Sequence, residues 1–175
     1  MGVSLNFIWK YYEESSESLR TREKYGLAVN DPKNILLHNR IKYFFVCAQE
    51  ELEELVKLDF LSEAEGRIKD DFKIRVSNYP AENPAFVVLF NRFNNKFDKV
   101  PYSSKAGNPC IIETWKSIVN KNGIVFIDNY EKSLELRHWL AHGRNWNLSP
   151  TSRFAVKDVK RIVENVLSVM NISIL

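Results

Sequence analysis

Apolar residues recur every three or four positions along most of the chain, which is the period of an amphipathic α-helix. The pattern predicts one helix from Leu5 to about Lys24 and a second from Asn34 to about Phe60, with a turn at Asn30-Asp31-Pro32 between them. The second segment also carries an acidic face that we expect to be solvated, made of Glu50, Glu51, Glu53 and Glu54.

Capping signals divide the middle of the chain. Ser62 with Glu65 three residues later matches a capping box, which predicts that a new helix starts there and runs to about Ser77. The segment Pro84–Lys99 contains the apolar run Phe86–Phe90, which suits either a buried strand or a helix, and we expect a helix.

The next predicted helix begins at Asn108, a good N-cap residue, with Pro109 in the first helical position. We expect it to end at Asn122-Gly123, because glycine commonly terminates helices. Its apolar face comprises Ile111, Ile112, Trp115, Ile118 and Val119.

The last third of the chain is predicted to hold two helices. We expect Ile124–Ile127 to be a short apolar connector, followed by a helix over about residues 129–145. Ser149-Pro150 breaks the chain before a final helix over about residues 151–170, which has its own apolar stripe. The sequence therefore predicts an all-α fold, a single-domain helical bundle with additional helices, over residues 1–175.

Composition agrees with one folded domain. A length of 175 residues suits a single domain, and 45% hydrophobic with 13% aromatic residues is enough to fill a core. No stretch approaches the roughly 20 apolar residues of a membrane helix, and the N-terminus lacks the pattern of a signal peptide. The two cysteines, Cys47 and Cys110, have apolar neighbours and are predicted to be buried thiols. We therefore expect a cytoplasmic protein that does not enter a membrane.

Basic residues are concentrated near the C-terminal end. Residues 137–175 hold six Lys and Arg against two Asp and Glu, although the net charge of the whole chain is only +3. An excess of positive charge in one segment indicates an anionic partner such as nucleic acid. A solvated helix face explains the same charges without any partner, and the composition leaves both interpretations open.

The same basic segment contains two of the three histidines of the chain, at positions 138 and 142. Residues four apart share a face of a helix, so His138 and His142 are predicted to lie together. The side chains of Arg137 and His142 leave an ideal helix in directions that differ by roughly 140° around its axis. The arginine side chain is long enough to bring its guanidinium back toward the imidazole.

The segment from Arg137 to Gly143 resembles the active motif of the HEPN superfamily, helical domains that include many ribonuclease toxins. That motif is an arginine, a polar residue, three variable residues and a histidine; here Arg137 and His138 are followed by Trp139-Leu140-Ala141 and His142. The specific resemblance covers about residues 130–147. It implies a metal-independent endoribonuclease that needs no cofactor and acts as a toxin or an antiviral defence effector.

The resemblance also implies a role for each motif residue. His142 would be the acid or base, Arg137 would grip the phosphate, and His138 would orient the site or share proton transfer. The products would be a 2′,3′-cyclic phosphate and a 5′-OH. A homodimer would form the composite active site, with one motif from each subunit.

Other residues and partners are expected more loosely. Arg144, Arg153 and Lys157 are predicted to bind RNA phosphates, and a cognate antitoxin or regulatory protein is a possible partner. Trp139 and Trp146 are seven residues apart and could stack on a base, but we expect buried or interfacial packing instead.

Four alternatives stay open, and one of them is that the chain is itself a partner or regulatory subunit, such as an antitoxin-like protein. The cluster could be structural, as arginine and histidine on a helix usually are. Glu135, His138 and His142 could form half of a metal site, although the sequence offers no second His or Cys cluster to complete it. The chain could also be a non-catalytic module of the same fold that binds nucleotide, RNA or protein. The third histidine, His38, is predicted to be a polar residue near a helix end.

Overall fold

The computed structural model describes residues 4–78, 84–104, 108–143, 147–148 and 154–173. Within these ranges the regular structure is entirely helical, so the predicted all-α class is confirmed. The α-helices in chain order are α1 (Leu5–Ala28), α2 (Ile35–Ser77), α3 (Pro84–Arg92), α4 (Ile111–Ile118), α5 (Lys121–Ala141) and α6 (Val156–Val169), with the short 3₁₀ helix η1 (Phe97–Lys99) after α3.

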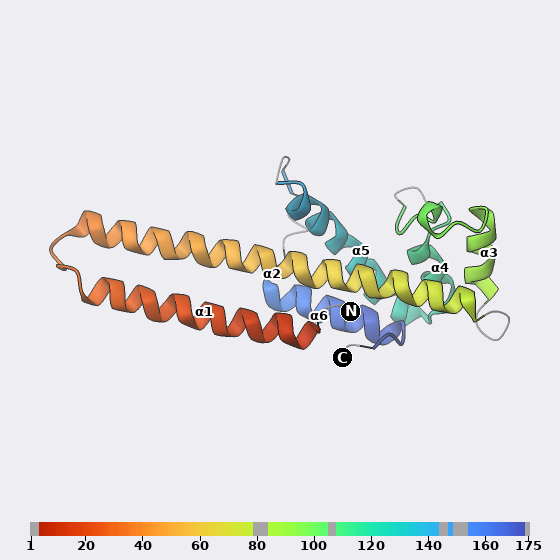
Figure 1. Cartoon of the computed structure of the whole chain (residues 1–175), viewed down its shortest axis with the longest axis horizontal. Helices are drawn as coiled ribbons and strands as arrows, with labels where there is room; N and C mark the ends of the chain where they lie inside the picture. Colours follow the sequence, from red (N-terminus) through yellow and green to blue (C-terminus); the bar gives the residue numbers. More distant parts are fainter. Residues whose placement is uncertain (1–3, 79–83, 105–107, 144–146, 149–153, 174–175) are drawn as a thin grey trace.

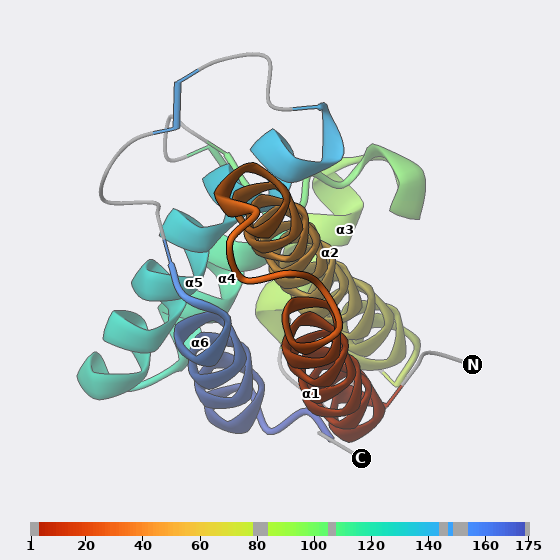
Figure 2. The same ribbon diagram turned by 90° about the vertical axis from the view of Figure 1, so that its left-hand side faces the viewer.

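Helix α2 is the longest helix, and most of the other helices pack along it. It is 43 residues long, and each other α-helix except α4 packs directly against it. Figure 1 shows α1 running back along the first half of α2 as a long hairpin, while α5 and α6 lie beside its second half. The view along the hairpin shows α5 and α6 together on one side of α2 (Figure 2).

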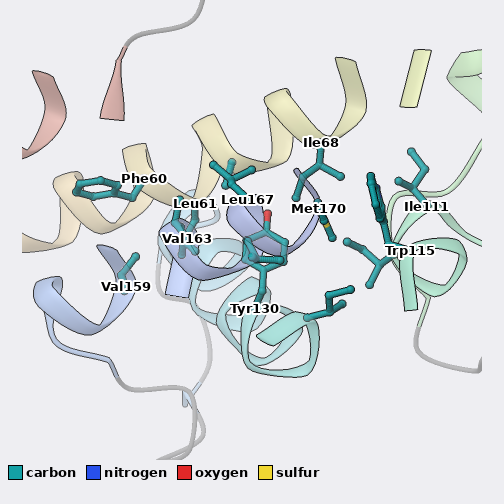
Figure 3. Close-up of a cluster of buried hydrophobic side chains, with 14 of the residues drawn as sticks. Phe60, Leu61, Ile68, Ile111, Trp115, Tyr130, Val159, Val163, Leu167 and Met170 are labelled. Atoms are coloured by element: carbon teal, nitrogen blue, oxygen red, sulfur yellow. The ribbon is translucent and has the colours of Figure 1, made fainter. Parts of the chain in front are cut away.

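The core lies where the second half of α2 meets α5 and α6. Phe60, Leu61 and Ile68 of α2 are buried in the same cluster as Tyr130 of α5. Figure 3 shows the α6 side chains that close this cluster, namely Val159, Val163, Leu167 and Met170. Helix α6 buries one stripe of valine and leucine, so it forms because its amphipathic face is covered on both sides by α2 and α5.

The predicted break at residue 62 is wrong, because α2 continues through it without interruption. A capping box works at a helix end, where backbone N–H groups lack partners, and residue 62 is far inside a helix that already pairs them. Glu65 has a different role there: its carboxylate forms ion pairs with Lys69 one turn later and with Arg137 of α5.

The predicted end at Asn122-Gly123 is also wrong, because this position begins α5 instead of ending α4. Asn120 is the N-cap, and its side-chain oxygen accepts a hydrogen bond from the N–H of Gly123 at 2.8 Å. Position 123 has no space for a side chain, because a Cβ atom there would lie 2.8 Å from Cγ1 of Val169 and 2.9 Å from Cβ of Val119. The expected connector Ile124–Ile127 is therefore helical.

Two other boundaries differ from the prediction. Helix α4 begins at Ile111 instead of Pro109, because Cys110 is the N-cap and its sulfur accepts from the N–H of Glu113. The helix expected over 84–99 stops at Arg92, where Asn94 and Asn95 adopt left-handed backbone conformations that turn the chain into η1. The predicted start of the last helix at residues 151–152 lies outside the described residues, but the prediction is wrong for residues 154 and 155, because α6 begins at Val156 with Ala155 as an extended N-cap residue.

The cysteines and the acidic face follow the sequence only in part. Cys110 is buried and Cys47 is half-buried, and both are free thiols. Glu50 and Glu51 are exposed as expected, whereas Glu53 is half-buried and accepts hydrogen bonds from Tyr12 and Gln49. No described helix is long and apolar enough to cross a membrane.

Candidate active site

The motif occupies the C-terminal end of α5. Arg137 and His138 lie in the last turns of the helix, and His142 is its C-cap residue. The N–H of His142 donates to the carbonyl oxygen of His138 at 3.1 Å, and Gly143 follows with a positive φ of 73°. The segment Ala141-His142-Gly143 therefore ends the helix, because glycine accepts the left-handed conformation that ends many helices. The predicted continuation to residue 145 is wrong for the described part, since the helix ends at Ala141.

The two imidazoles lie together, as the four-residue spacing predicts. The ring centroids of His138 and His142 are 4.2 Å apart in an edge-on arrangement, and both side chains are exposed. Two exposed imidazoles at this distance can bind one anionic group together or pass a proton through a shared ligand.

Arg137 faces a different neighbour. Its Nε atom lies 3.4 Å from Oε2 of Glu65 on α2, and this atom is buried without an aligned hydrogen bond. The contact is therefore an ion pair instead of a well-formed hydrogen bond. The side chain of Arg137 keeps an exposed fraction of 32%, so other atoms of that side chain reach the surface.

A small polar cluster surrounds this ion pair. Glu65 has a side-chain exposure of only 14% and pairs with Lys69 as well as with Arg137. The hydroxyl groups of the half-buried Tyr102 and the buried Tyr130 lie 2.8 Å apart and form a hydrogen bond. Burial raises the pKa of Tyr102, and the neighbouring Tyr130 raises it further; burial likewise raises the pKa of Tyr130.

Glu65 is the residue that sequence reasoning assigned to the wrong role. Its spacing from Ser62 suggested a helix cap, and nothing in the spacing connects α2 to the distant Arg137. Tyr102 and Tyr130 were not assigned a role either. One feature of the sequence could have indicated the role of Glu65: it is a charged residue on the buried face of a helix, and such a residue needs a partner of opposite charge.

The remaining predicted site residues are only partly placed. Lys157 is exposed in the first turn of α6, on a different helix from the motif. Arg144, Arg153 and Trp146 lie outside the described residues, so their predicted phosphate and base contacts stay predictions. Trp139 is half-buried and packs against the hydrophobic core, which agrees with the packing role.

The metal alternative receives no support from the described residues. They bring no group of three His, Cys, Asp or Glu side chains together in a way that could hold a metal ion. His38 lies in the first turn of α2, with Nε2 3.3 Å from the carbonyl oxygen of Asn30, as expected for a polar residue at a helix end.

One hollow formed by the described residues lies away from the motif. This hollow of about 500 Å³ lies at the opposite end of α5, and its lining includes Arg75, Trp115 and Asn120. None of Arg137, His138 and His142 lines this hollow.

Comparison of the chain with family models, curated proteins and solved structures found no match. The assignment of function therefore depends on the chemistry of the α5 end.

Proposed function

We propose that this chain is a metal-independent endoribonuclease whose acid and base groups are His138 and His142. The observation that carries the proposal is the pair of exposed imidazoles, 4.2 Å apart at the end of α5, where Arg137 directly precedes His138 in the sequence. The HEPN-like motif that these residues make is the second support. A toxin or antiviral effector is the biological role that the resemblance implies.

The proposed reaction needs no atom beyond RNA and these side chains. One imidazole takes the proton from a ribose 2′-OH while the oxygen attacks the adjacent phosphorus. The bond from phosphorus to the 5′-oxygen breaks, and the imidazolium of the other histidine gives that oxygen a proton. The products are a 2′,3′-cyclic phosphate and a 5′-OH.

Arg137 would stabilise the negative charge that develops on the phosphate. Its ion pair with Glu65 fixes the direction of the side chain. A phosphate would contact the part of that side chain that stays exposed. The resemblance further implies a homodimer in which the α5 ends of two copies meet and each contributes a motif. A cognate inhibitor would bind the same end.

The test is incubation of the purified chain with total cellular RNA in excess chelator, followed by analysis of the fragment ends. We expect cleavage that leaves cyclic phosphate and 5′-OH ends and that His142→Ala abolishes. His38→Ala is the matched control, because it removes an imidazole from the remote hairpin and should leave cleavage intact. Equal activity of the wild type and His142→Ala would refute the proposal.

A binding module without catalysis is the second candidate, and the Arg137–Glu65 pair is the observation that favours it. A guanidinium neutralised by a carboxylate is less available to a phosphate than an unpaired one. This candidate predicts that RNA binds the α5 end and is recovered intact.

A further inference from the structure

Two cations share the carboxylate of Glu65. Nζ of Lys69, one turn later on α2, lies 2.5 Å from Oε1, and Nε of Arg137 on α5 lies 3.4 Å from Oε2. Each cation therefore faces its own carboxylate oxygen, and the three ionised side chains together carry one net positive charge. In an ordinary ion pair, by contrast, one carboxylate neutralises one cation completely.

The three side chains of this cluster differ in how far they reach the surface. The Glu65 side chain is 14% exposed, whereas that of Arg137 is 32% and that of Lys69 is 45% exposed. The carboxylate is therefore largely covered by protein, while both cations are partly open to solvent. An anion from solution can reach the two cations from the side that the carboxylate does not occupy, and their net charge attracts it.

Lys69 is held from a second direction as well. Its Nζ lies over the ring of Tyr102, 5.2 Å from the ring centroid, which is a cation–π contact. The hydroxyl of Tyr102 is hydrogen-bonded to that of Tyr130 on α5, so the same helix supports both cations. An ammonium group that two contacts already hold loses little further conformational entropy when it binds an anion.

The spacing of the two cations suits a phosphate. Carboxylate and phosphate oxygens accept hydrogen bonds from basic side chains in similar geometry. Two cations that each face one oxygen of the same carboxylate are therefore close enough together to bind two oxygens of one phosphate. A phosphodiester of RNA carries one negative charge, so its binding would bring the net charge of the cluster to zero.

We propose that Lys69 is a second phosphate-binding residue of the candidate active site and that it binds one backbone phosphate of RNA together with Arg137. The inference rests on the proposed function, because it takes RNA as the ligand of the α5 end. Lys69 donates to one oxygen of the phosphate, and the exposed part of Arg137 donates to another. Glu65 is a positioning residue that holds both cations without touching the RNA.

The shared carboxylate changes what the Arg137–Glu65 pair means for RNA binding. A guanidinium with a carboxylate to itself has little charge left for a phosphate. Here Lys69 takes part of the same negative charge, so the cluster keeps an excess of one positive charge. Lys69→Gln removes that excess and leaves Arg137 neutralised by Glu65.

Binding of a fluorescein-labelled, mixed-sequence single-stranded RNA to the full chain tests the proposal, with His142→Ala in every variant to keep the RNA intact. We expect Lys69→Gln to raise Kd about fivefold at low salt and to reduce the slope of log Kd against log salt by about 0.7, as for one lost charge. Lys69→Arg keeps the charge and should retain most of the affinity. Lys73→Gln is the matched control, because Lys73 lies one turn farther along α2 and pairs with Asp70 instead of Glu65; it should change Kd by less than about twofold.

A second comparison tests whether the two cations hold the same phosphate. Arg137→Gln should weaken binding by a similar factor, and Lys69→Gln/Arg137→Gln should weaken it by less than the product of the two single effects, because one phosphate contact is lost only once. Thermal denaturation of each variant shows that it is folded. A purely structural lysine would lower Tm in Lys69→Gln and leave the salt slope unchanged.

Three outcomes would overturn the proposal: an unchanged Kd and salt slope in Lys69→Gln, equal losses in Lys69→Gln and Lys73→Gln, or multiplicative effects in the double variant. Cleavage by the chain with its native His142 is measured separately. Cleavage together with an unchanged Kd in Lys69→Gln would reject this inference and keep the ribonuclease. RNA binding that depends on Lys69 without any cleavage would do the reverse, and a parent chain that binds no RNA would reject both.

Discussion

Arg137 and Glu65 join the end of α5 to the middle of α2 through an ion pair, with Nε 3.4 Å from Oε2. The pair connects the candidate active site to the core, because Glu65 is nearly buried and the fully buried Ala64 precedes it. Two functions are therefore combined in one contact. It holds α5 against α2, and it fixes the direction of the arginine that the motif supplies.

Removal of the Glu65 charge should destabilise the fold. In Glu65→Gln, Arg137 and Lys69 lose their shared counter-charge, and the buried Nε of Arg137 faces a neutral amide. We expect a loss of about 1–2 kcal/mol in the free energy of unfolding, measured by urea denaturation, since the pair is partly exposed. Glu14→Gln is the control; it breaks an exposed pair with Lys10 and should change stability by less than about 0.5 kcal/mol. Equal effects of the two variants would contradict a structural role for the Glu65 pair.

The histidines should be removable without damage to the fold. His138 and His142 are exposed, and the cap at His142 is made by its backbone, so alanine at either position should shift Tm by less than about 2 °C. Arg137→Ala should lower Tm more, because it leaves Glu65 without its α5 partner. Thermal denaturation of the three variants checks this order. If His142→Ala unfolded the protein, its loss of cleavage would say nothing about catalysis.

Gly123 should not tolerate a side chain. The methyl group of alanine would lie 2.8 Å from Val169 and 2.9 Å from Val119, so α4 or α6 must move. We expect Gly123→Ala to lower the free energy of unfolding by about 1–3 kcal/mol. Gly66→Ala is the matched control inside α2: a methyl group there would have no neighbouring atom within 4 Å, so the substitution should stabilise by about 0.5–1 kcal/mol. A stabilising Gly123→Ala would show that α4 and α6 pack less tightly than described.

The buried tyrosine pair should make the fold sensitive to alkaline pH. Burial raises the pKa of both Tyr102 and Tyr130 above the ordinary value of 10.0, so the folded state keeps protons that the unfolded state has lost. Stability is therefore complete below about pH 10 and falls as the pH rises toward the folded-state values. Urea midpoints at about pH 9 and pH 11 measure this fall. The variant Tyr102→Phe/Tyr130→Phe should lose less stability over that interval, and an identical loss would exclude the pair as the cause.

Local patterns in the sequence were enough to predict the all-α class and the geometry of the histidine pair. The helical period is a property of neighbouring residues, and so is the four-residue spacing that brings His138 and His142 to a ring distance of 4.2 Å. The same local reasoning placed Ile111, Ile112 and Trp115 on a buried face of α4, which the structure confirms.

Contacts between distant segments set the features that local signals could not. Ser62 and Glu65 have the spacing of a cap, but packing against α5 and α6 keeps α2 continuous through them. Glycine commonly follows the end of a helix, but Gly123 lies in the first turn of α5, where the close approach of Val169 leaves no space for a side chain. The partner of Arg137 lies on a helix far away in sequence, because an ion pair depends on distance in space.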